Sequence, residues 1–212
     1  MKQYCGPGDT LSSKAQDIEM ETIEPALDGR RLRSERSRQA IVNASIELIN
    51  EGILVPTAQL ISERANVGIR SFFRHFVDME SLFKAVEFQN RESTEALFIG
   101  GDRDGTLAER ILHAVQRRSE GYENQKNIIL TTAAQSWRHE ILRKNYARYQ
   151  RGLRKDLNDW LPELSSVSSN RREMIDAAAS FEMWHRLRFH QRLSKKTSIQ
   201  IIVEAVTDLM LS

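Results

Sequence analysis

The chain has 212 residues, which is enough for one or two domains with a hydrophobic core. Hydrophobic residues make up 40% of it and charged residues 28%, and only four prolines and ten glycines interrupt it, so long helices are expected. No run of 18 uncharged apolar residues occurs, and the first residues lack an apolar signal segment, which argues against a membrane span or secretion. We therefore expect a cytoplasmic protein without a membrane partner.

The formal net charge of +2 is distributed unevenly near the N-terminus. Residues 1–29 hold two basic and six acidic side chains, whereas residues 30–38, RRLRSERSR, hold five arginines and one glutamate. Such a run is either the solvated start of a helix or an arm that meets a negatively charged partner. Because residues 1–29 contain few large apolar side chains, we expect residues 1–33 to form a disordered extension with a basic arm. The single cysteine, Cys5, lies in this extension and excludes an internal disulfide.

A helical pattern begins at Ser34. Small and apolar residues then recur on one helical face, at Ile41, Ala44, Ser45, Leu48 and Ile49. Gly52 is suited to end this helix, because glycine adopts the left-handed conformation that follows many helices. Thr57 is suited to cap a second, short helix that carries Leu60 and Ile61 on its apolar face.

A tight turn and another short helix follow. Asn66 tolerates the left-handed backbone that such a turn needs, and Gly68 can serve as the next N-cap. Residues 69–76 then form the helix, and Asp78 caps a fourth one. Two short helices cannot bury much surface alone, so they need the helix at 34–51 as a base. At least two of three phenylalanines should face that base: Phe72, Phe73 and Phe76.

The opposite face of the helix at 69–76 is left free by this packing. It presents Arg70 and Arg74, one turn apart, together with Ile69 and Ser71. A short helix held from behind, with arginines in front, is typical of a helix that reads the major groove of DNA. An arginine there can pair with guanine through two hydrogen bonds, or it can contact phosphate.

The remainder of the chain also has helical character, with loops expected at 100–105 and 161–169. Apolar residues recur at helical spacing over 106–121 and 125–160. The second of these segments is too long for one ordinary helix, so we expect a break near 136–139. Since no segment alternates like a strand, the chain is predicted to be all-α.

Two final helices are expected at 170–193 and 197–211. The last one has a regular apolar face formed by Ile199, Ile202, Val203, Val206, Leu209 and Met210. Paired across a two-fold axis, these helices would form a four-helix bundle. We therefore expect a homodimer that is held together by this end of the chain.

Residues 37–86 resemble the N-terminal domain of the TetR (tetracycline-repressor) family of bacterial transcription regulators. The resemblance is carried without gaps by AIVNASIELINEG, PTAQLISERANVG, SFFRHF and DMESL. It implies an all-α protein with a three-helix helix-turn-helix DNA-binding domain over residues 34–79. Residues 80–212 would then form a helical domain for effector binding and dimerisation.

The resemblance also implies which residues contact DNA. Ile69 would meet a thymine methyl, and Thr57, Ser71 and His75 match phosphate contacts of the family; for His75 a ring buried against the first helix is the alternative. With the arginine arm included, the expected DNA-binding residues are Arg33, Arg36, Thr57, Gly68, Ile69, Arg70, Ser71, Arg74 and His75. Two family contacts are missing, because Phe73 replaces a tyrosine and Met79 a lysine. The arm could supply the charge that these replacements remove.

C-terminal domains of the family usually hold a small molecule. The aromatic candidates for lining such a cavity are Trp137, Tyr146, Phe181 and Trp184, for which packing in the core is the alternative. His185 and His190 are five residues apart, which does not suit two metal ligands on one helical face. No nucleophile elbow, phosphate-binding loop or dinucleotide motif occurs, so we expect neither an enzyme nor a metal or cofactor.

These features predict a ligand-responsive, DNA-binding transcription regulator. We expect a homodimeric repressor that a small molecule of unknown identity releases from a palindromic double-stranded operator. One alternative is a TetR-like regulator that responds to a protein partner or acts constitutively. A second alternative is a helical enzyme or structural protein that has lost DNA binding.

Overall fold

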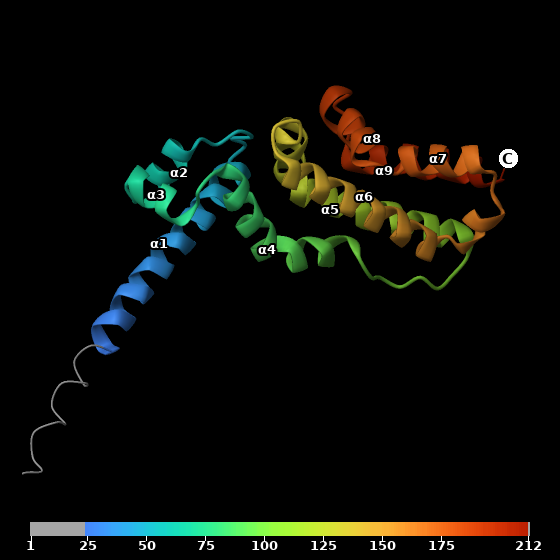
Figure 1. Cartoon of the computed structure of the whole chain (residues 1–212). Coiled ribbons are helices and arrows are strands. Elements are labelled where there is room, and N and C mark those ends of the chain that lie inside the picture. The colour runs from blue at the N-terminus through green and yellow to red at the C-terminus, as the bar shows by residue number, and fades with distance from the viewer. Residues whose placement is uncertain (1–23, 212) are drawn as a thin grey trace, which may run out of the picture.

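The structure is a computed structural model that describes residues 24–211. Between those residues the chain is helical and contains no strand, as the all-α prediction requires. The α-helices are α1 (Glu24–Asn50), α2 (Ala58–Arg64), α3 (Ile69–His75), α4 (Met79–Phe98), α5 (Leu107–Gln135), α6 (Glu140–Trp160), α7 (Ser169–Ala178), α8 (Phe181–His185) and α9 (Lys195–Leu211). A short 3₁₀-helix (Pro162–Ser166) precedes α7, and a π-helical turn (Arg186–His190) follows α8. Figure 1 shows α1, α2 and α3 gathered at one end, with α4 leading to the body formed by α5 to α9.

The N-terminal helices pack around one apolar core. Its buried residues are Ile41, Val42, Ala44, Leu48, Ile61, Phe72, Phe76 and Leu82. Phe72 and Phe76 are almost fully buried, whereas the side chain of Phe73 is 50% exposed. The prediction that at least two phenylalanines face the base helix is therefore confirmed. Burial of each ring stabilises the fold by about 1.5–3 kcal/mol, which holds α3 against α1.

The predicted turns and caps of this region are confirmed. Asn66 has φ 53° and Gly52 has φ 94°, so both residues adopt the left-handed backbone that ends the preceding helix. The Thr57 hydroxyl accepts a hydrogen bond from the Leu60 backbone N–H at 3.2 Å. The Asp78 carboxylate and Ser81 form a reciprocal capping box at the start of α4. These local signals fix the path of the chain around α2 and α3.

Helix α1 begins at Glu24, ahead of the start that we predicted at Ser34. Residues 24–33 are therefore helical and not disordered, whereas residues 1–23, with Cys5, lie outside the described part of the chain. Arginine and leucine are good helix formers, so this segment can continue the helix without a core to pack on. Leu32 is 51% exposed, and Figure 1 shows the first half of α1 extending away from the other helices.

The body has a second apolar core around α5. Its largest fully buried side chains include Trp160, Trp184 and Ile175, and α9 contributes Ile202 and Val206. The apolar face of α9 is thus partly used inside the protomer, against α5 and α7. Our expectation that this whole face serves the dimer is too broad, because Val206 is only 1% exposed in a single chain.

The helix breaks in the body differ from the predicted ones at two places. The break near 136–139 is confirmed, since α5 ends at Gln135 and α6 begins at Glu140. Gly121, however, does not end a helix. A Cβ atom there would lie 2.4 Å from Cε1 of Phe98, so this glycine allows α4 and α5 to approach closely. The helix predicted at 170–193 is interrupted, because the Ser180 hydroxyl caps α8 by accepting a hydrogen bond from the Met183 N–H.

Candidate DNA interface and internal cavity

The outer face of α3 carries the side chains predicted to meet DNA. Arg70 and Arg74 are exposed, while Ile69 and Ser71 are half-buried. The Arg74 guanidinium donates to the Ser71 hydroxyl at 3.3 Å, so these two side chains share one side of the helix. Gly68 is exposed at the N-cap of α3. Positive charge and hydroxyl groups are therefore presented together on the free face of a helix that is held by buried rings.

His75 lies at the end of α3 and is half-buried. Its Nε2 atom is enclosed and has no hydrogen-bond partner among the described residues. Burial lowers the pKa of the imidazole below its usual value, and the nearby charges of Arg74 and Arg38 lower it further. The ring is therefore neutral at pH 7 and adds no charge to the surface beside Arg74.

The arginine arm is a stretch of exposed helix. Arg33 and Arg36 are exposed on the first half of α1, and the Arg33 Nε–H donates to the Gly29 carbonyl at 3.1 Å. Closer to the core, the Arg38 guanidinium lies over the Phe76 ring at 5.2 Å from its centroid. Arg38 therefore belongs to the packing of the three-helix core, whereas Arg33 and Arg36 are free of that core.

A cavity of about 320 Å³ lies where α4, α5 and α6 meet, within the range of small-molecule sites in proteins. Most of its wall is apolar or aromatic. Ile46 of α1 and Val86 of α4 line it, and both also pack against the three-helix core. Phe98 and Tyr122 line it from the side of the body core. The cavity is thus the place where the two cores of the chain come together.

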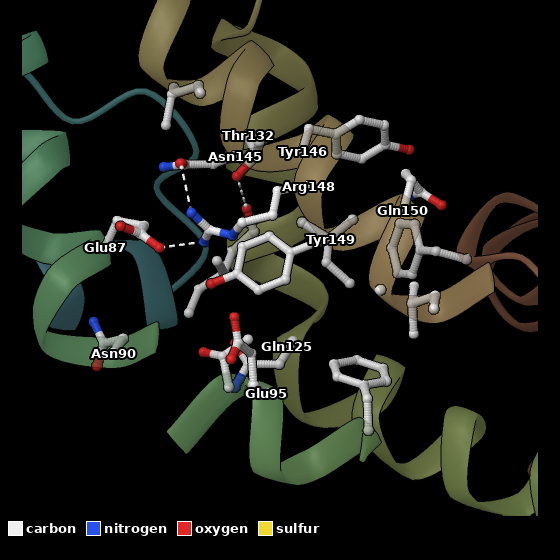
Figure 2. Close-up of a pocket in the computed structure, with 18 of the residues that line it drawn as sticks. Glu87, Asn90, Glu95, Gln125, Thr132, Asn145, Tyr146, Arg148, Tyr149 and Gln150 are labelled. Carbon is white, nitrogen blue, oxygen red and sulfur yellow. Dashed lines mark hydrogen bonds and ion pairs between the residues drawn. The ribbon is translucent and has the colours of Figure 1, made fainter. Parts of the chain in front are cut away.

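Polar side chains enter this wall from α4 and α6 (Figure 2). Arg148 forms an ion pair with Glu87 and donates to Asn145, while Arg91 donates to Glu87 at 2.7 Å through two nitrogens. Burial raises the pKa of the Glu87 carboxyl, but the hydrogen bonds from Arg91 and Arg148 outweigh burial and lower it. Glu87 is therefore ionised and accepts hydrogen bonds from both arginines, and its ion pair with Arg148 connects α4 to α6.

Other polar groups in the wall lack partners within the described part of the chain. The Gln125 Oε1, Thr131 Oγ1 and Arg148 Nε atoms are buried without a hydrogen bond. A buried polar atom without a partner costs about 1–3 kcal/mol. Such groups are uncommon in a filled core and are typical of places that accommodate a bound molecule.

The aromatic residues predicted to line a ligand cavity lie in three different places. Tyr146 and Phe181 line the cavity, and the Tyr146 hydroxyl donates to Glu182 at 2.5 Å. Trp137 is 76% exposed at the corner between α5 and α6, and Trp184 is fully buried in the body core. Sequence reasoning missed the polar wall residues Glu87, Asn90, Glu95, Gln125, Thr131 and Arg148. Their signal was available as polar side chains at inward-facing positions of amphipathic helices.

The corner between α5 and α6 also contacts the N-terminal helices directly. The Gln135 side-chain amide donates to the Leu54 carbonyl at 2.9 Å, and the Asn127 amide donates to the Asn50 carbonyl at 2.8 Å. The rings of Phe83 and His139 meet edge to face at 5.0 Å between centroids. The body is therefore joined to the N-terminal helices through side chains as well as through α4.

Neither a metal site nor a membrane span emerges from the described residues. Between residues 24 and 211, no three acidic, histidine or cysteine side chains come together in a way that could hold a metal ion. His185 and His190 contact each other edge to face at 5.3 Å between ring centroids, and His185 stacks on Phe181 and Phe189. None of the helices from α1 to α9 is both long and apolar enough to cross a membrane.

Comparisons with known proteins agree with this arrangement. Residues 41–86, from the first core residue of α1 to the middle of α4, match the family model of bacterial regulatory proteins of the tetR family. No curated protein matches the chain.

Several solved structures share the fold. A transcriptional regulator of Rhodococcus sp. Rha1 superposes with a TM-score of 0.60 at 13% identity, over 84% of this chain and 95% of that one. A transcriptional regulator of Streptomyces coelicolor A3(2) gives 0.55 at 20% identity, over 81% and 99%. A TetR transcriptional regulator, also from Rhodococcus sp. RHA1, gives 0.50 at 16% identity, over 84% and 98%. At these identities the similarity concerns the fold.

The family match covers the helices that present Arg70 and Arg74, and the shared fold extends through the helices that enclose the cavity. Residues 41–86 are therefore similar to the N-terminal domain of the tetR family of bacterial regulatory proteins, and the chain shares the fold of solved transcriptional regulators.

Proposed function

We propose that this regulator binds a palindromic operator as a homodimer and that a small molecule in the cavity weakens this binding. The observation that carries the proposal is the shared wall of the cavity. Ile46 and Val86 belong both to that wall and to the packing of the three-helix core. A molecule that moves them moves the base on which α3 rests, because packed cores do not deform continuously.

In the proposed DNA complex, α3 lies in the major groove. Arg70 reads a base edge, while Ser71 and Thr57 contact phosphate. Arg33 and Arg36 lie exposed on the helical arm, where they can neutralise further phosphates. This added charge compensates for Phe73 and Met79, which lack the polar tips of the family's tyrosine and lysine.

The proposed dimer uses the apolar residues that the protomer leaves partly uncovered. On α9 these include Ile199, Val203 and Met210, and on α7 Met174 is 55% exposed. Val203→Glu should prevent dimerisation without entering the protomer core, whereas Val206→Glu should unfold the body. A V203E protein that sediments as a dimer at micromolar concentration argues against this interface.

The main rival is control by a protein partner or constitutive binding. It is disfavoured by the cavity itself, because a volume of about 320 Å³ with unpaired polar groups in its wall is typical of a small-molecule site. The second rival, loss of DNA binding, is disfavoured by the exposed arginines of α3 and of the arm.

A neutral fluorescent probe, N-phenyl-1-naphthylamine, tests the ligand response. Its emission rises in apolar surroundings, so it should report entry into the cavity. Gln125→Trp should block entry, since it fills space and removes an unpaired carbonyl oxygen. The matched control is Asn124→Trp, because Asn124 is the exposed neighbour of Gln125 on α5 and does not line the cavity.

The second measurement is the affinity for a labelled duplex from the promoter region of the protein's own gene. Saturating probe should weaken duplex binding by about 5–150-fold, the usual range of coupling between two sites. The Gln125→Trp protein should show no such effect. If the probe enters the wild-type cavity and duplex affinity stays the same, the proposed ligand response is wrong.

A further inference from the structure

One carboxylate in the cavity wall has no close partner. Four charged side chains line the cavity: Glu87, Glu95, Arg148 and Asp156. Asp156 pairs with Arg103 at 2.8 Å, and Glu87 pairs with both Arg91 and Arg148. The remaining carboxylate, that of Glu95, has no hydrogen bond or ion pair among the described residues, and it interacts with Arg91 only through the longer-range attraction of their charges.

Glu95 lies at the edge of the cavity. It is half-buried, and it also lines the shallow hollow that Phe88, Arg91 and Ile99 form on the outer surface of α4. Figure 2 shows its carboxylate beside Gln125 and below the ring of Tyr149. An ammonium group placed there would keep part of its hydration, which limits the cost of its burial.

Rings surround the space behind Glu95. Phe98, Tyr122 and Phe181 line the cavity, and their rings pack at 5.6 Å between neighbouring centroids. Tyr149 faces the same space (Figure 2). Aromatic faces attract cations, and aromatic edges and alkyl groups accept an apolar body. The wall therefore suits a molecule with one positive end and an apolar remainder.

An anionic ligand fits this wall poorly. Arg148 is the one cation among the described residues of the wall. Its charge is already paired with Glu87, one of its N–H groups donates to Asn145, and its Nε is enclosed. A carboxylate would have to compete with Glu87 for Arg148, and it would also lie near the negative charge of Glu95. Nearby, Arg117 donates to the carbonyls of Ala96 and Phe98, so it is engaged by the end of α4.

We propose that the effector is a cationic amphiphile, a small amine with an aromatic or alkyl body, whose ammonium group pairs with Glu95 while the body fills the cavity. This inference rests on the proposed function, because it assigns the ligand of the same cavity. Gln125 and Thr131 offer the amine or a polar substituent further hydrogen bonds through atoms that now have none. The negative charge of Glu95 at the edge of the cavity and the shape of the apolar interior would then together determine which molecules bind.

The test displaces N-phenyl-1-naphthylamine with three molecules that share one body: 4-phenylbutylamine, 4-phenylbutan-1-ol and 4-phenylbutyrate. At pH 7 they carry a positive, a neutral and a negative end. We expect the amine to displace the probe at about tenfold lower concentration than the alcohol, as for a hydrogen bond to a charged group, and the acid to be weakest.

Glu95→Gln should remove the advantage of the amine over the alcohol, when both are compared against the probe affinity measured for that same variant. Glu92→Gln is the matched control, because Glu92 is an exposed carboxylate on the same helix that does not line the cavity. Equal or stronger displacement by the alcohol or the acid overturns the amine assignment, as does an amine advantage that survives E95Q. These outcomes leave the cavity as an effector site, whereas a probe that fails to enter the wild-type protein overturns the proposed function as well.

Discussion

The core of the three N-terminal helices is filled by side chains, whereas the core between α4, α5 and α6 encloses a cavity of about 320 Å³. The first region keeps its charged residues on the surface, where Arg70 and Arg74 are exposed. The second region brings Glu87 and Arg148 into the wall of its cavity. The difference supports the proposed function, in which the filled core holds a surface for DNA and the cavity accepts a small molecule.

The two regions are not independent, because they share α4. Its first half carries Leu82, which is buried in the three-helix core, and its second half carries Phe98, which packs in the body. Glu87 lies between them and binds Arg148 of α6. A displacement of α4 therefore changes the packing of both regions. Variants in each region can show whether the stability and binding of one region depend on the other.

The largest effect is expected from Phe72→Ala. The ring of Phe72 is fully buried and contacts Phe73 and Phe76, so its removal should destabilise the three-helix region by about 3–5 kcal/mol. Duplex binding should be abolished. Phe73→Ala is the matched control, because that ring is 50% exposed and its removal should cost far less stability. Urea unfolding followed by circular dichroism measures both. Equal destabilisation by the two changes would contradict the packing of α3 on α1.

The body should respond most to Gly121→Ala. The new methyl group would meet the Phe98 ring at 2.4 Å and force it to shift, at a cost of about 1–3 kcal/mol. Because Phe98 lines the cavity, binding of N-phenyl-1-naphthylamine should change as well. Gly152→Ala is the control for stability alone, because a methyl group there would have nothing within 4 Å and alanine favours a helix, although Gly152 also lines the cavity. If G121A melts like G152A, α4 and α5 are packed less closely than this contact requires.

The DNA-facing surface can be divided by comparing Arg70→Ala with Ser71→Ala. Arg70 should read a base, and removal of such an interaction costs about 1–3 kcal/mol of discrimination. R70A should therefore relax the preference at one base position per half-site. Ser71→Ala should weaken all sequences about equally, because a hydroxyl only positions the helix on phosphate. Binding-site selection on both proteins measures this. An unchanged sequence preference for R70A would make Arg70 a phosphate contact.

The smallest effect concerns the helical arm. Replacing Arg30, Arg31, Arg33 and Arg36 by glutamine should reduce the slope of log K against log salt by about 0.9 for each phosphate that the arm no longer neutralises. Glutamine keeps the helix, so stability should change little. The same replacement at Arg151 and Arg172, which are exposed in the body, is the control. An arm variant with the wild-type slope would show that the first half of α1 lies away from the duplex.

The two regions also differed in how much their sequences predicted. Local signals predicted the path of the chain through the N-terminal helices. Thr57 and Asp78 cap helices, and Asn66 adopts the left-handed backbone that asparagine tolerates. Helix start signals are weaker where no core is present, so the sequence did not reveal that α1 begins at Glu24. In the body the spacing of apolar residues predicted the helices. It did not predict the role of Gly121, which lies inside α5 and leaves room for the Phe98 ring.

The cavity could not be predicted in the same way, because it depends on which helices meet. Trp137 and Tyr146 are both aromatic residues of the segment predicted as helical at 125–160, yet one is exposed and the other lines the cavity. The partner of Arg148 is Glu87, 61 residues away. Pairings over such distances are set by tertiary packing and not by local pattern. For the same reason, the assignment of Arg70 and Ser71 to base and phosphate stays a prediction.

Coupling between the two regions is the central claim, and one linkage measurement tests it most directly. The affinity of N-phenyl-1-naphthylamine is measured for the free protein and for the protein saturated with operator duplex. Thermodynamic reciprocity requires that the duplex weaken probe binding by the same factor by which the probe weakens duplex binding. We predict equal factors of about 5–150 for the wild-type protein. Identical probe affinities with and without duplex would contradict this coupling.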